Sequence, residues 1–146
     1  MIRFLSEMSF GHTSNLVKLG RNMDPRQSSQ LMLSLVIPVF NEEHNIMPLF
    51  ARLKTAALQM SEVRVEVIFV DDHSTDKTST LLMEICKDND IFRYLRLSRN
   101  SGSHIAVLAG LEHARGDAAV FLAADLQDPP ELIPRMVQEW GMGNHV

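Results

Sequence analysis

The sequence contains a single cysteine, Cys86, and lacks any apolar run long enough to cross a membrane. One cysteine excludes a disulfide within the chain and fits a reducing compartment. Its apolar neighbours Leu81, Leu82 and Ile85 predict that Cys86 is a core residue. A transmembrane helix needs about 20 apolar residues, whereas a serine and a proline interrupt the longest run here, residues 31–40. The sequence therefore lacks the marks of a disulfide-stapled or membrane-spanning domain.

A strong charge of either sign is also missing. The net charge of -4 in 146 residues gives no electrostatic reason to expect a nucleic acid partner. The hydrophobic content of 45% suits one soluble domain with a sizeable core. Residues 1–30 show weak periodicity and no secretory signal, so we expect a poorly ordered N-terminal extension there and a folded domain over residues 31–146.

From residue 31 onward, strand patterns alternate with helical patterns. The predicted strands are residues 31–40, 63–70, 92–97 and 117–124, and the predicted helices are residues 45–60, 74–87, 103–115 and 130–140. Ser74 and Ser103 are expected N-caps of the second and third helices. This βαβαβαβα order predicts an α/β fold with a parallel sheet between two helical layers.

Polar residues gather where the predicted strands end, and these ends share one edge of a parallel sheet, where ligands bind in open α/β folds. One cluster is residues 38–43, another is residues 71–76, and a third is residues 125–131. The carboxylate and amide oxygens of the third cluster suit a hard divalent cation such as Mg²⁺ or Mn²⁺. The loop of residues 98–103 leads into a helix N-terminus, which favours anions such as phosphate. His73 and His104 are interpreted as loop residues because no second metal ligand stands at a suitable spacing.

Each cluster also has a purely structural interpretation. Asn41 and Glu42 could cap the following helix, and Asp71 to Asp76 could be turn and capping residues. Asp125 and Asp128 could cap the last helix and complement its dipole. The expected convergence of all three clusters on one edge favours a binding site.

Four segments in order resemble the large inverting glycosyltransferase family 2. They are residues 36–43 (Val-Ile-Pro-Val-Phe-Asn-Glu-Glu), 70–76 (Val-Asp-Asp-His-Ser-Thr-Asp), 99–102 (Arg-Asn-Ser-Gly) and 124–131 (Ala-Asp-Leu-Gln-Asp-Pro-Pro-Glu). The resemblance is strongest to polyprenyl-phosphate glycosyltransferases, which include dolichol-phosphate mannose synthase and bactoprenol glucosyltransferases. It implies a GT-A fold whose Rossmann-like half binds a UDP- or GDP-linked sugar for inverting transfer to a membrane polyprenyl phosphate.

The resemblance also implies roles for individual residues. It implies that Pro38, Phe40 and Glu42 line the nucleotide pocket, that Asn41 supports the loop, and that Asp71 and Asp72 contact the base and ribose. It also implies that Arg99, Asn100 and Gly102 lie near the donor phosphates and that Asp125 and Gln127 hold the divalent metal. A polyprenyl phosphate is already anionic, so it needs little help from a general base. A full-length homologue is expected at the cytoplasmic face of the plasma membrane.

Two departures from the family pattern stand out. Ala123 occupies the first position of the usual Asp-x-Asp metal motif, which removes one anionic ligand that Gln127 and Asp128 could replace. The expected acceptor half and C-terminal membrane helices do not follow Val146, and residues 141–146 resemble a turn into a further strand, so we expect a truncated domain with no assignable catalytic residue.

Three other interpretations stay open at this point. A donor-binding fragment without activity fits Ala123 and the apparent truncation. A phosphoacceptor receiver domain fits residues 69–73 and would make Asp125 the phosphorylated residue, but it leaves residues 31–43 unexplained. A dinucleotide-dependent oxidoreductase fits poorly because no Gly-x-Gly-x-x-Gly follows the first strand.

Overall fold

A mixed sheet in the order β1-β5-β2-β3-β4 organises the part of the chain that the computed structural model describes, residues 16–18 and 30–141. The parallel strands are β2 (Met32–Val39), β3 (Arg64–Asp71), β4 (Phe92–Arg96) and β5 (Ala118–Phe121). A short strand, β1 (Leu16–Lys18), pairs antiparallel with β5. The four strands expected from the sequence are thus present and parallel.

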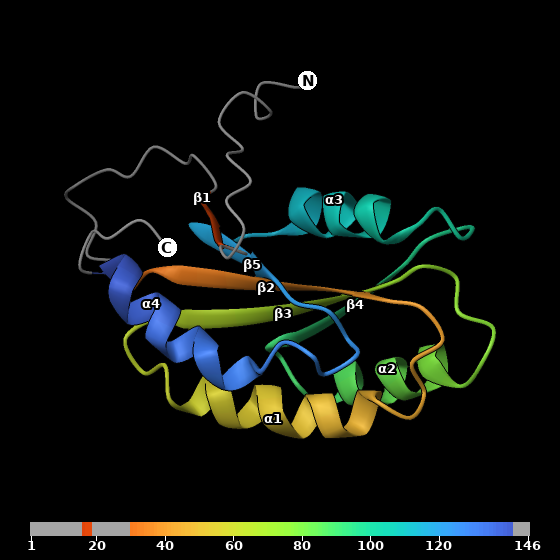
Figure 1. Cartoon of the computed structure of the whole chain (residues 1–146), viewed down its shortest axis with the longest axis horizontal. Coiled ribbons are helices and arrows are strands. Elements are labelled where there is room, and N and C mark those ends of the chain that lie inside the picture. Colours follow the sequence, from red (N-terminus) through yellow and green to blue (C-terminus); the bar gives the residue numbers. More distant parts are fainter. Residues whose placement is uncertain (1–15, 19–29, 142–146) are drawn as a thin grey trace.

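Helices cover both faces of this sheet (Figure 1). One face carries α1 (Ile46–Leu58), α2 (Thr78–Lys87) and α4 (Ile133–Gly141), which follows the 3₁₀ turn η1 (Pro130–Leu132). The other face carries α3 (Ser103–His113). The predicted three-layer α/β architecture is confirmed. Among the described residues, none of the helices has the length and hydropathy needed to cross a bilayer.

The strand order separates two folds that share this alternation. In a receiver domain the third strand pairs with the first, in the order 2-1-3-4-5. Here β4 pairs with β3, and β5 pairs with β2, so the four parallel strands follow the order 3-2-1-4. This is the order of a Rossmann-like half. The receiver-domain interpretation is therefore wrong for this chain.

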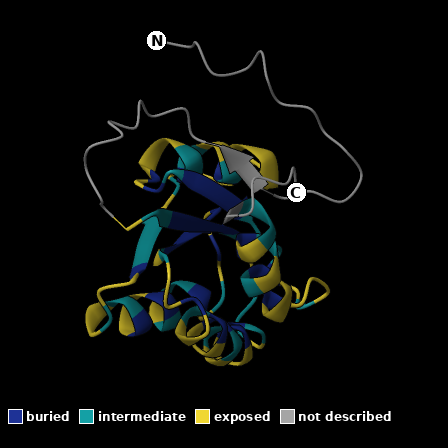
Figure 2. Cartoon of the chain, turned by 90° about the vertical axis from the view of Figure 1, so that its left-hand side faces the viewer, coloured by how far each residue is buried: buried dark blue, intermediate teal, exposed yellow. Residues whose placement is uncertain are grey.

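The core lies on both sides of β2 and β3, whose apolar residues are buried on either face (Figure 2). Leu35, Ile37 and Phe69 pack toward the larger cluster, whereas Val36 and Ile68 belong to the smaller one. Cys86 packs partly buried against the larger cluster, as expected, and burial raises the pKa of its thiol to about 11. The thiol is therefore protonated at neutral pH, which is the less nucleophilic form of cysteine.

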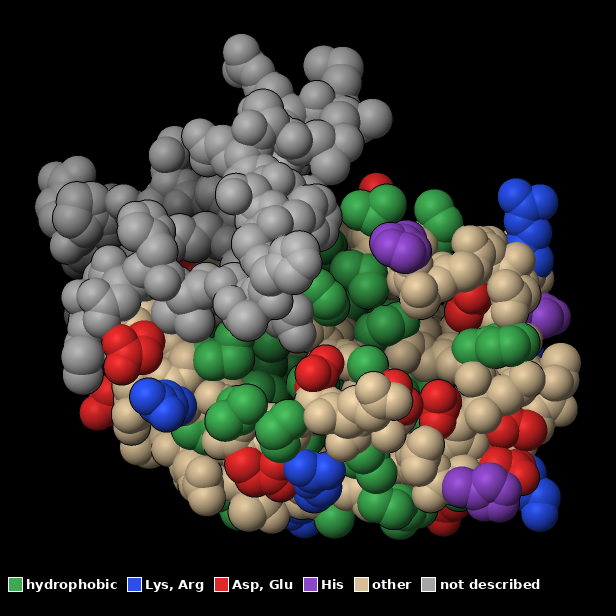
Figure 3. Space-filling view, viewed as in Figure 1, with side chains coloured by type: hydrophobic (Ala, Val, Ile, Leu, Met, Phe, Trp, Pro, Cys, Tyr) green, Lys and Arg blue, Asp and Glu red, His purple; other side chains and the backbone are tan. Residues whose placement is uncertain are grey.

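The helix on the other face is less covered. Hydrophobic side chains reach the surface over α3 (Figure 3), where Ile105 and Leu108 are each nearly half exposed. In contrast, Ala106 and Gly110 of the same helix are buried against the sheet. The contact between α3 and the sheet therefore rests on small residues.

Two expected N-caps are wrong. Helix α2 begins at Thr78 with Lys77 as its N-cap residue, and Ser74 lies before the helix. Helix α3 has Gly102 at its N-cap position, with φ at 90°, and Ser103 is its first residue. Hydrogen bonds between loops, described below, hold these segments and explain both differences.

The expectation of a poorly ordered extension falls mostly outside the described residues, as does the turn expected at residues 142–146. Within the extension, Leu16–Lys18 forms β1, which no sequence pattern predicted. Its backbone hydrogen bonds to β5 complete the edge of the sheet there.

Gly110 offers a direct test of the contact between α3 and the sheet. A Cβ at this position would overlap Cγ1 of Val36 and lie 3.1 Å from Cγ2 of Val70. We expect Gly110→Ala to lower the free energy of unfolding by about 1–3 kcal/mol, because both valines are buried and stiff. Urea denaturation would measure the loss, with the exposed Glu112→Ala as a control on the same helix. A gain in stability would show that helix propensity outweighs the overlap.

Candidate functional site

A pocket of about 200 Å³ lies at the carboxyl ends of the parallel strands. Its lining residues come from the segments after β2, β3 and β5 and from the start of α3; they are Pro38, Val39, Phe40, Glu42, Asp72, Ser103, Ala123, Ala124 and Asp125. Segments that are distant in the sequence therefore meet at one site. Five predicted site residues line it: Pro38, Phe40, Glu42, Asp72 and Asp125.

Asp71 does not line the pocket, although the family resemblance placed it at the base and ribose. Its side chain is fully buried, and its Oδ1 accepts the N–H of Ser74 at 2.8 Å. Its Oδ2 accepts the Tyr94 hydroxyl at 3.1 Å and lies 3.1 Å from Nη1 of Arg96. Protein partners therefore enclose this carboxylate, and it organises the loop that follows β3.

Asp72 lines the pocket and also anchors a neighbouring loop. Its two carboxylate oxygens accept the backbone N–H groups of Ser101 and Gly102, each at 2.7 Å. These two donors at the start of α3 are thus engaged by a protein carboxylate. Gly102 adopts a positive φ of 90° at this point, which a glycine tolerates, and the next residue, Ser103, lines the pocket.

The loops after β2 and β3 are joined by backbone and side-chain hydrogen bonds. Asn41, which has a φ of 54°, donates its N–H to Ser74 Oγ at 3.0 Å and accepts the N–H of Thr75 at 2.8 Å. The N–H of Glu42 donates to the buried hydroxyl of Thr78 at 2.8 Å. Asn41 therefore supports the loop through these bonds and does not cap α1, whose N-cap residue is Asn45.

Asp76 extends the same connection. Its carboxylate accepts the N–H of Thr78 at 2.9 Å and the N–H of Glu43 at 3.2 Å. Burial tends to raise the pKa of Asp76, but the hydrogen bonds from Thr78 and Glu43 outweigh it and hold that pKa below its ordinary value. Asp71 and Asp76 thus make the turn hydrogen bonds that the structural interpretation expects, and the nucleotide contact expected of Asp71 stays a prediction.

Arg99 and Asn100 lie exposed on the loop after β4 and do not line the pocket. The described residues give their side chains no hydrogen bond or ion pair, while Gly102 lies between them and the pocket residue Ser103. The loop is placed beside the pocket, but the three predicted phosphate contacts stay predictions.

Asp125 is exposed at the pocket, and its Oδ1 accepts the N–H of Gln127 at 3.1 Å. Neither Asp125 nor Asp128 caps the turn that begins the last helical segment, because no side chain caps η1. Within residues 30–141, no group of three His, Cys, Asp or Glu side chains is arranged to hold a metal ion. A carboxylate beside an amide offers hard oxygen donors that fit Mg²⁺ or Mn²⁺ only if a ligand supplies the rest of the shell.

Sequence reasoning missed Tyr94, Arg96 and Thr78, which support the loops of the pocket. Arg96 Nη2 donates to the carbonyl of Ser74 at 2.9 Å, and Tyr94 exchanges a 2.7 Å hydrogen bond with Ser79. The signal for Tyr94 and Arg96 was the weak alternation of the third strand, where polar side chains interrupt the apolar pattern. That signal indicates an unusual strand, but it does not show which residues Tyr94 and Arg96 contact.

Comparison with known proteins places these residues among sugar transferases. A family model described as "Glycosyl transferase family 2" matches residues 34–146. An undecaprenyl-phosphate 4-deoxy-4-formamido-L-arabinose transferase of Pseudomonas aeruginosa is 41% identical over 116 residues, covering 79% of this chain and 34% of the relative. A bactoprenol glucosyl transferase of Shigella phage SfX is 37% identical over 113 residues, covering 77% of this chain and 37% of the relative. The chain thus spans about a third of the length of these relatives.

A solved structure shares the fold. The mannosyltransferase of Pyrobaculum calidifontis in complex with GDP-Man and Mn²⁺ matches with a TM-score of 0.59 at 22% identity, covering 76% of this chain and 32% of that one. At this identity the likeness establishes the fold.

Proposed function

Because this chain belongs to glycosyl transferase family 2, we propose that residues 31–146 are the nucleotide-sugar-binding half of an inverting transferase. The observation that carries this proposal is the convergence of Glu42, Asp72 and Asp125 on one pocket at the carboxyl edge of the sheet. That edge is where Rossmann-like halves bind nucleotides. The chain spans about a third of the length of its relatives, so the whole reaction is proposed only for a longer protein of their length.

The pocket residues suggest how a UDP- or GDP-linked sugar is bound. Phe40 is 45% exposed and offers an aromatic face to a base, while Pro38 fixes the backbone of the same wall. Glu42 and Asp72 offer carboxylate oxygens that accept hydrogen bonds from base or ribose groups. Arg99, Asn100 and Gly102 lie on the loop that faces the donor phosphates in this proposal.

Asp125, with Gln127 beside it, would hold a divalent cation together with the donor diphosphate. When bound, that cation neutralises the charge that develops on the nucleoside diphosphate leaving group. Asp125 has room for this role because the described residues give its carboxylate a single hydrogen bond, from Gln127. Ala123 lines the pocket without adding a ligand, which makes Asp125 the main anionic donor on this wall.

The acceptor in the longer protein is proposed to be a polyprenyl phosphate. Two relatives carry undecaprenyl-phosphate or bactoprenol in their names. A phosphate oxygen is already anionic near neutral pH, so it can attack the anomeric carbon without a strong general base and invert its configuration. We propose the cytoplasmic membrane face as the location of such a longer protein, because its proposed acceptor is a membrane lipid and its proposed donor is soluble.

The proposal is tested by calorimetric titration of the 146-residue chain with UDP and GDP, with and without Mn²⁺. We expect one of them to bind with Mn²⁺ present and to lose at least about tenfold in affinity when EDTA removes the metal. A titration with AMP controls for unspecific nucleotide binding. If neither diphosphate shows metal-dependent affinity, the proposed function fails.

A further inference from the structure

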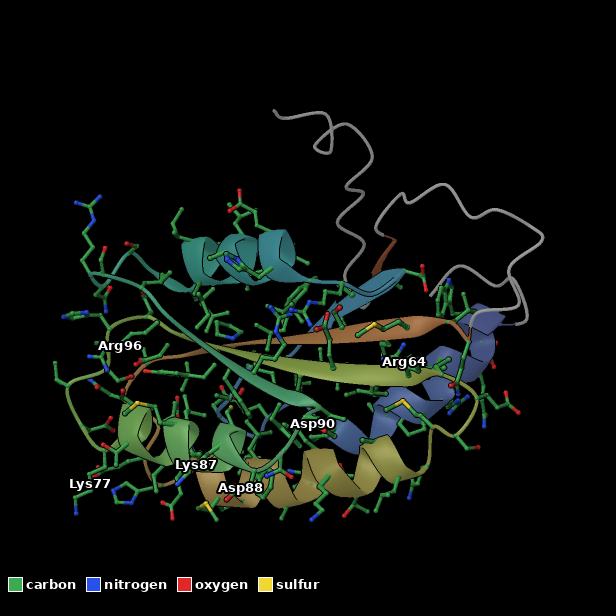
Figure 4. All side chains as sticks on the ribbon, turned by 180° about the vertical axis from the view of Figure 1, so that it is seen from behind. Arg64, Lys77, Lys87, Asp88, Asp90 and Arg96 are labelled. Carbon is green, nitrogen blue, oxygen red and sulfur yellow. The ribbon has the colours of Figure 1, made fainter. Side chains whose placement is uncertain are left out.

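Strand β4 carries two arginines, one near each of its ends, that make the same kind of contact with a buried carboxylate. Arg93 Nη1 lies 2.8 Å from the buried carboxylate of Glu66 and also donates to the carbonyl of His113. Arg96 Nη1 lies 3.1 Å from the buried carboxylate of Asp71 and its Nη2 donates to the carbonyl of Ser74. Figure 4 shows Arg96 at the end of the sheet where Lys77 lies, away from Arg64 at the start of β3. Only the second pair is therefore at the pocket end.

The pair at the pocket end fixes the start of the loop after β3. The Asp71 carboxylate accepts the N–H of Ser74, and the Arg96 guanidinium contacts both ends of this turn, pairing with the carboxylate and donating to the Ser74 carbonyl. Tyr94 adds its hydroxyl to Asp71 Oδ2. Residues 71–74 are thus held as a closed turn by two side chains of β4.

The turn of residues 71–74 also holds the segment after β2, which forms one wall of the pocket. Ser74 is buried, and its Oγ accepts the N–H of Asn41. The two neighbours of Asn41, Phe40 and Glu42, both line the pocket. Hydrogen bonds therefore lead from Arg96 through Ser74 to Asn41, which lies in the chain between the two residues proposed to contact the donor.

We propose that Arg96 is a positioning residue of the nucleotide pocket, acting through Asp71 and Ser74 on the loop that carries Phe40 and Glu42. The inference rests on the proposed function. Its physical basis is that removing the guanidinium breaks both contacts of Arg96 with the turn, so the buried Asp71 charge keeps only neutral donors, Tyr94 and the Ser74 N–H. The loop then samples other conformations, and binding must order it again.

The two arginines provide matched variants for the test. The affinity for the nucleoside diphosphate that the wild-type chain binds with Mn²⁺ is measured for Arg96→Gln and Arg93→Gln, with urea denaturation of each. We expect both variants to lower the unfolding midpoint, but only Arg96→Gln to weaken binding, by about tenfold. Arg96→Lys, which keeps a charge beside Asp71, should recover part of that affinity. An equal loss of affinity in both glutamine variants would assign the effect to general destabilisation and overturn the inference.

Tyr94→Phe keeps the inference testable if Arg96→Gln does not fold. It removes the hydroxyl that contacts Asp71 and the half-buried Ser79, and it should weaken nucleotide binding by about threefold with a small loss of stability. Unchanged affinity in whichever of Arg96→Gln and Tyr94→Phe fold, beside a wild-type chain that binds, would overturn this inference and leave the proposed function standing. A wild-type chain without affinity would overturn both.

Discussion

Asp125→Asn is expected to weaken Mn²⁺-dependent binding of a nucleoside diphosphate by about 100-fold, equivalent to roughly 2.7 kcal/mol. The substitution keeps the size of the side chain and an oxygen that can accept the Gln127 N–H. It removes the one anionic metal donor that this wall offers in the described part of the chain, since Ala123 supplies none. Binding measured without metal should change little, because the nucleoside contacts lie on other segments.

The same loop provides the control for this prediction. Asp128 is also exposed, three residues further along, but it does not line the pocket. Asp128→Asn should therefore leave affinity within about twofold of the wild type. Equal losses in the two variants would mean that the loop's overall charge, and not coordination by Asp125, supports binding. A loss confined to Asp128→Asn would contradict the assigned ligand.

The position of the site could be predicted from the sequence because topology supplies it. Apolar runs alternating with amphipathic segments dictate parallel strands, and parallel strands end at one edge. Glu42, Asp72 and Asp125 each follow a strand, so a reader of the sequence can place them together without knowing any side-chain contact. The sequence could not distinguish the strand order of a receiver domain from that of a Rossmann-like half, because the two differ in which strands pair.

The division of labour between the two adjacent aspartates could not be predicted. Asp71 and Asp72 have the same chemistry and stand side by side, but the alternation of a strand sends their side chains in opposite directions. One meets Tyr94 and Arg96 of the neighbouring strand, and the other meets the backbone of residues 101–102. The partners of both residues come from distant segments, so local patterns could not tell Asp71 from Asp72, and the family resemblance placed both at the base and ribose.

The same reason explains the two failed caps. Ser74 and Ser103 precede helical patterns, which makes each a good N-cap by local preference. In the folded chain the Ser74 hydroxyl receives the Asn41 N–H, and the Asp72 carboxylate holds the residues before Ser103. Tertiary hydrogen bonds thus replaced local ones at the loops that form the pocket, where such departures from local rules are expected.

Glu66 lies within β3, away from the pocket, and another large effect is expected there. It is 3% exposed in the middle of β3, opposite Ser34 of β2. Its Oε1 accepts the Ser34 hydroxyl and the Arg115 N–H, each at 2.6 Å, and its Oε2 pairs with Arg93 at 2.8 Å. A charged residue inside an apolar strand was visible in the sequence, but its partners were not.

Glu66→Gln should lower the free energy of unfolding by about 3 kcal/mol at pH 7, because a buried ion pair loses one partner and an amide N–H₂ then faces Arg93. Urea denaturation measures this loss, and the exposed Glu62→Gln provides a control that should leave stability unchanged. A loss below about 0.5 kcal/mol would show that solvent replaces the pair.

The loss should depend on pH in a defined direction. Burial tends to raise the pKa of Glu66, but hydrogen bonds from Ser34, Arg115 and Arg93 and the charge of Arg93 outweigh it and hold that pKa below the ordinary value of 4.5. The folded state therefore binds this proton less readily than the unfolded state, so Glu66 contributes stability above pH 4.5 that is lost as the pH falls toward its folded pKa. The difference in the free energy of unfolding between the wild type and Glu66→Gln should therefore shrink below that pH.

Asp76 and Glu131, whose pKa values are also lowered, are present in both chains, so their effects cancel in the comparison. A difference that stays constant or grows in acid would contradict an ionised Glu66 as the centre of this network.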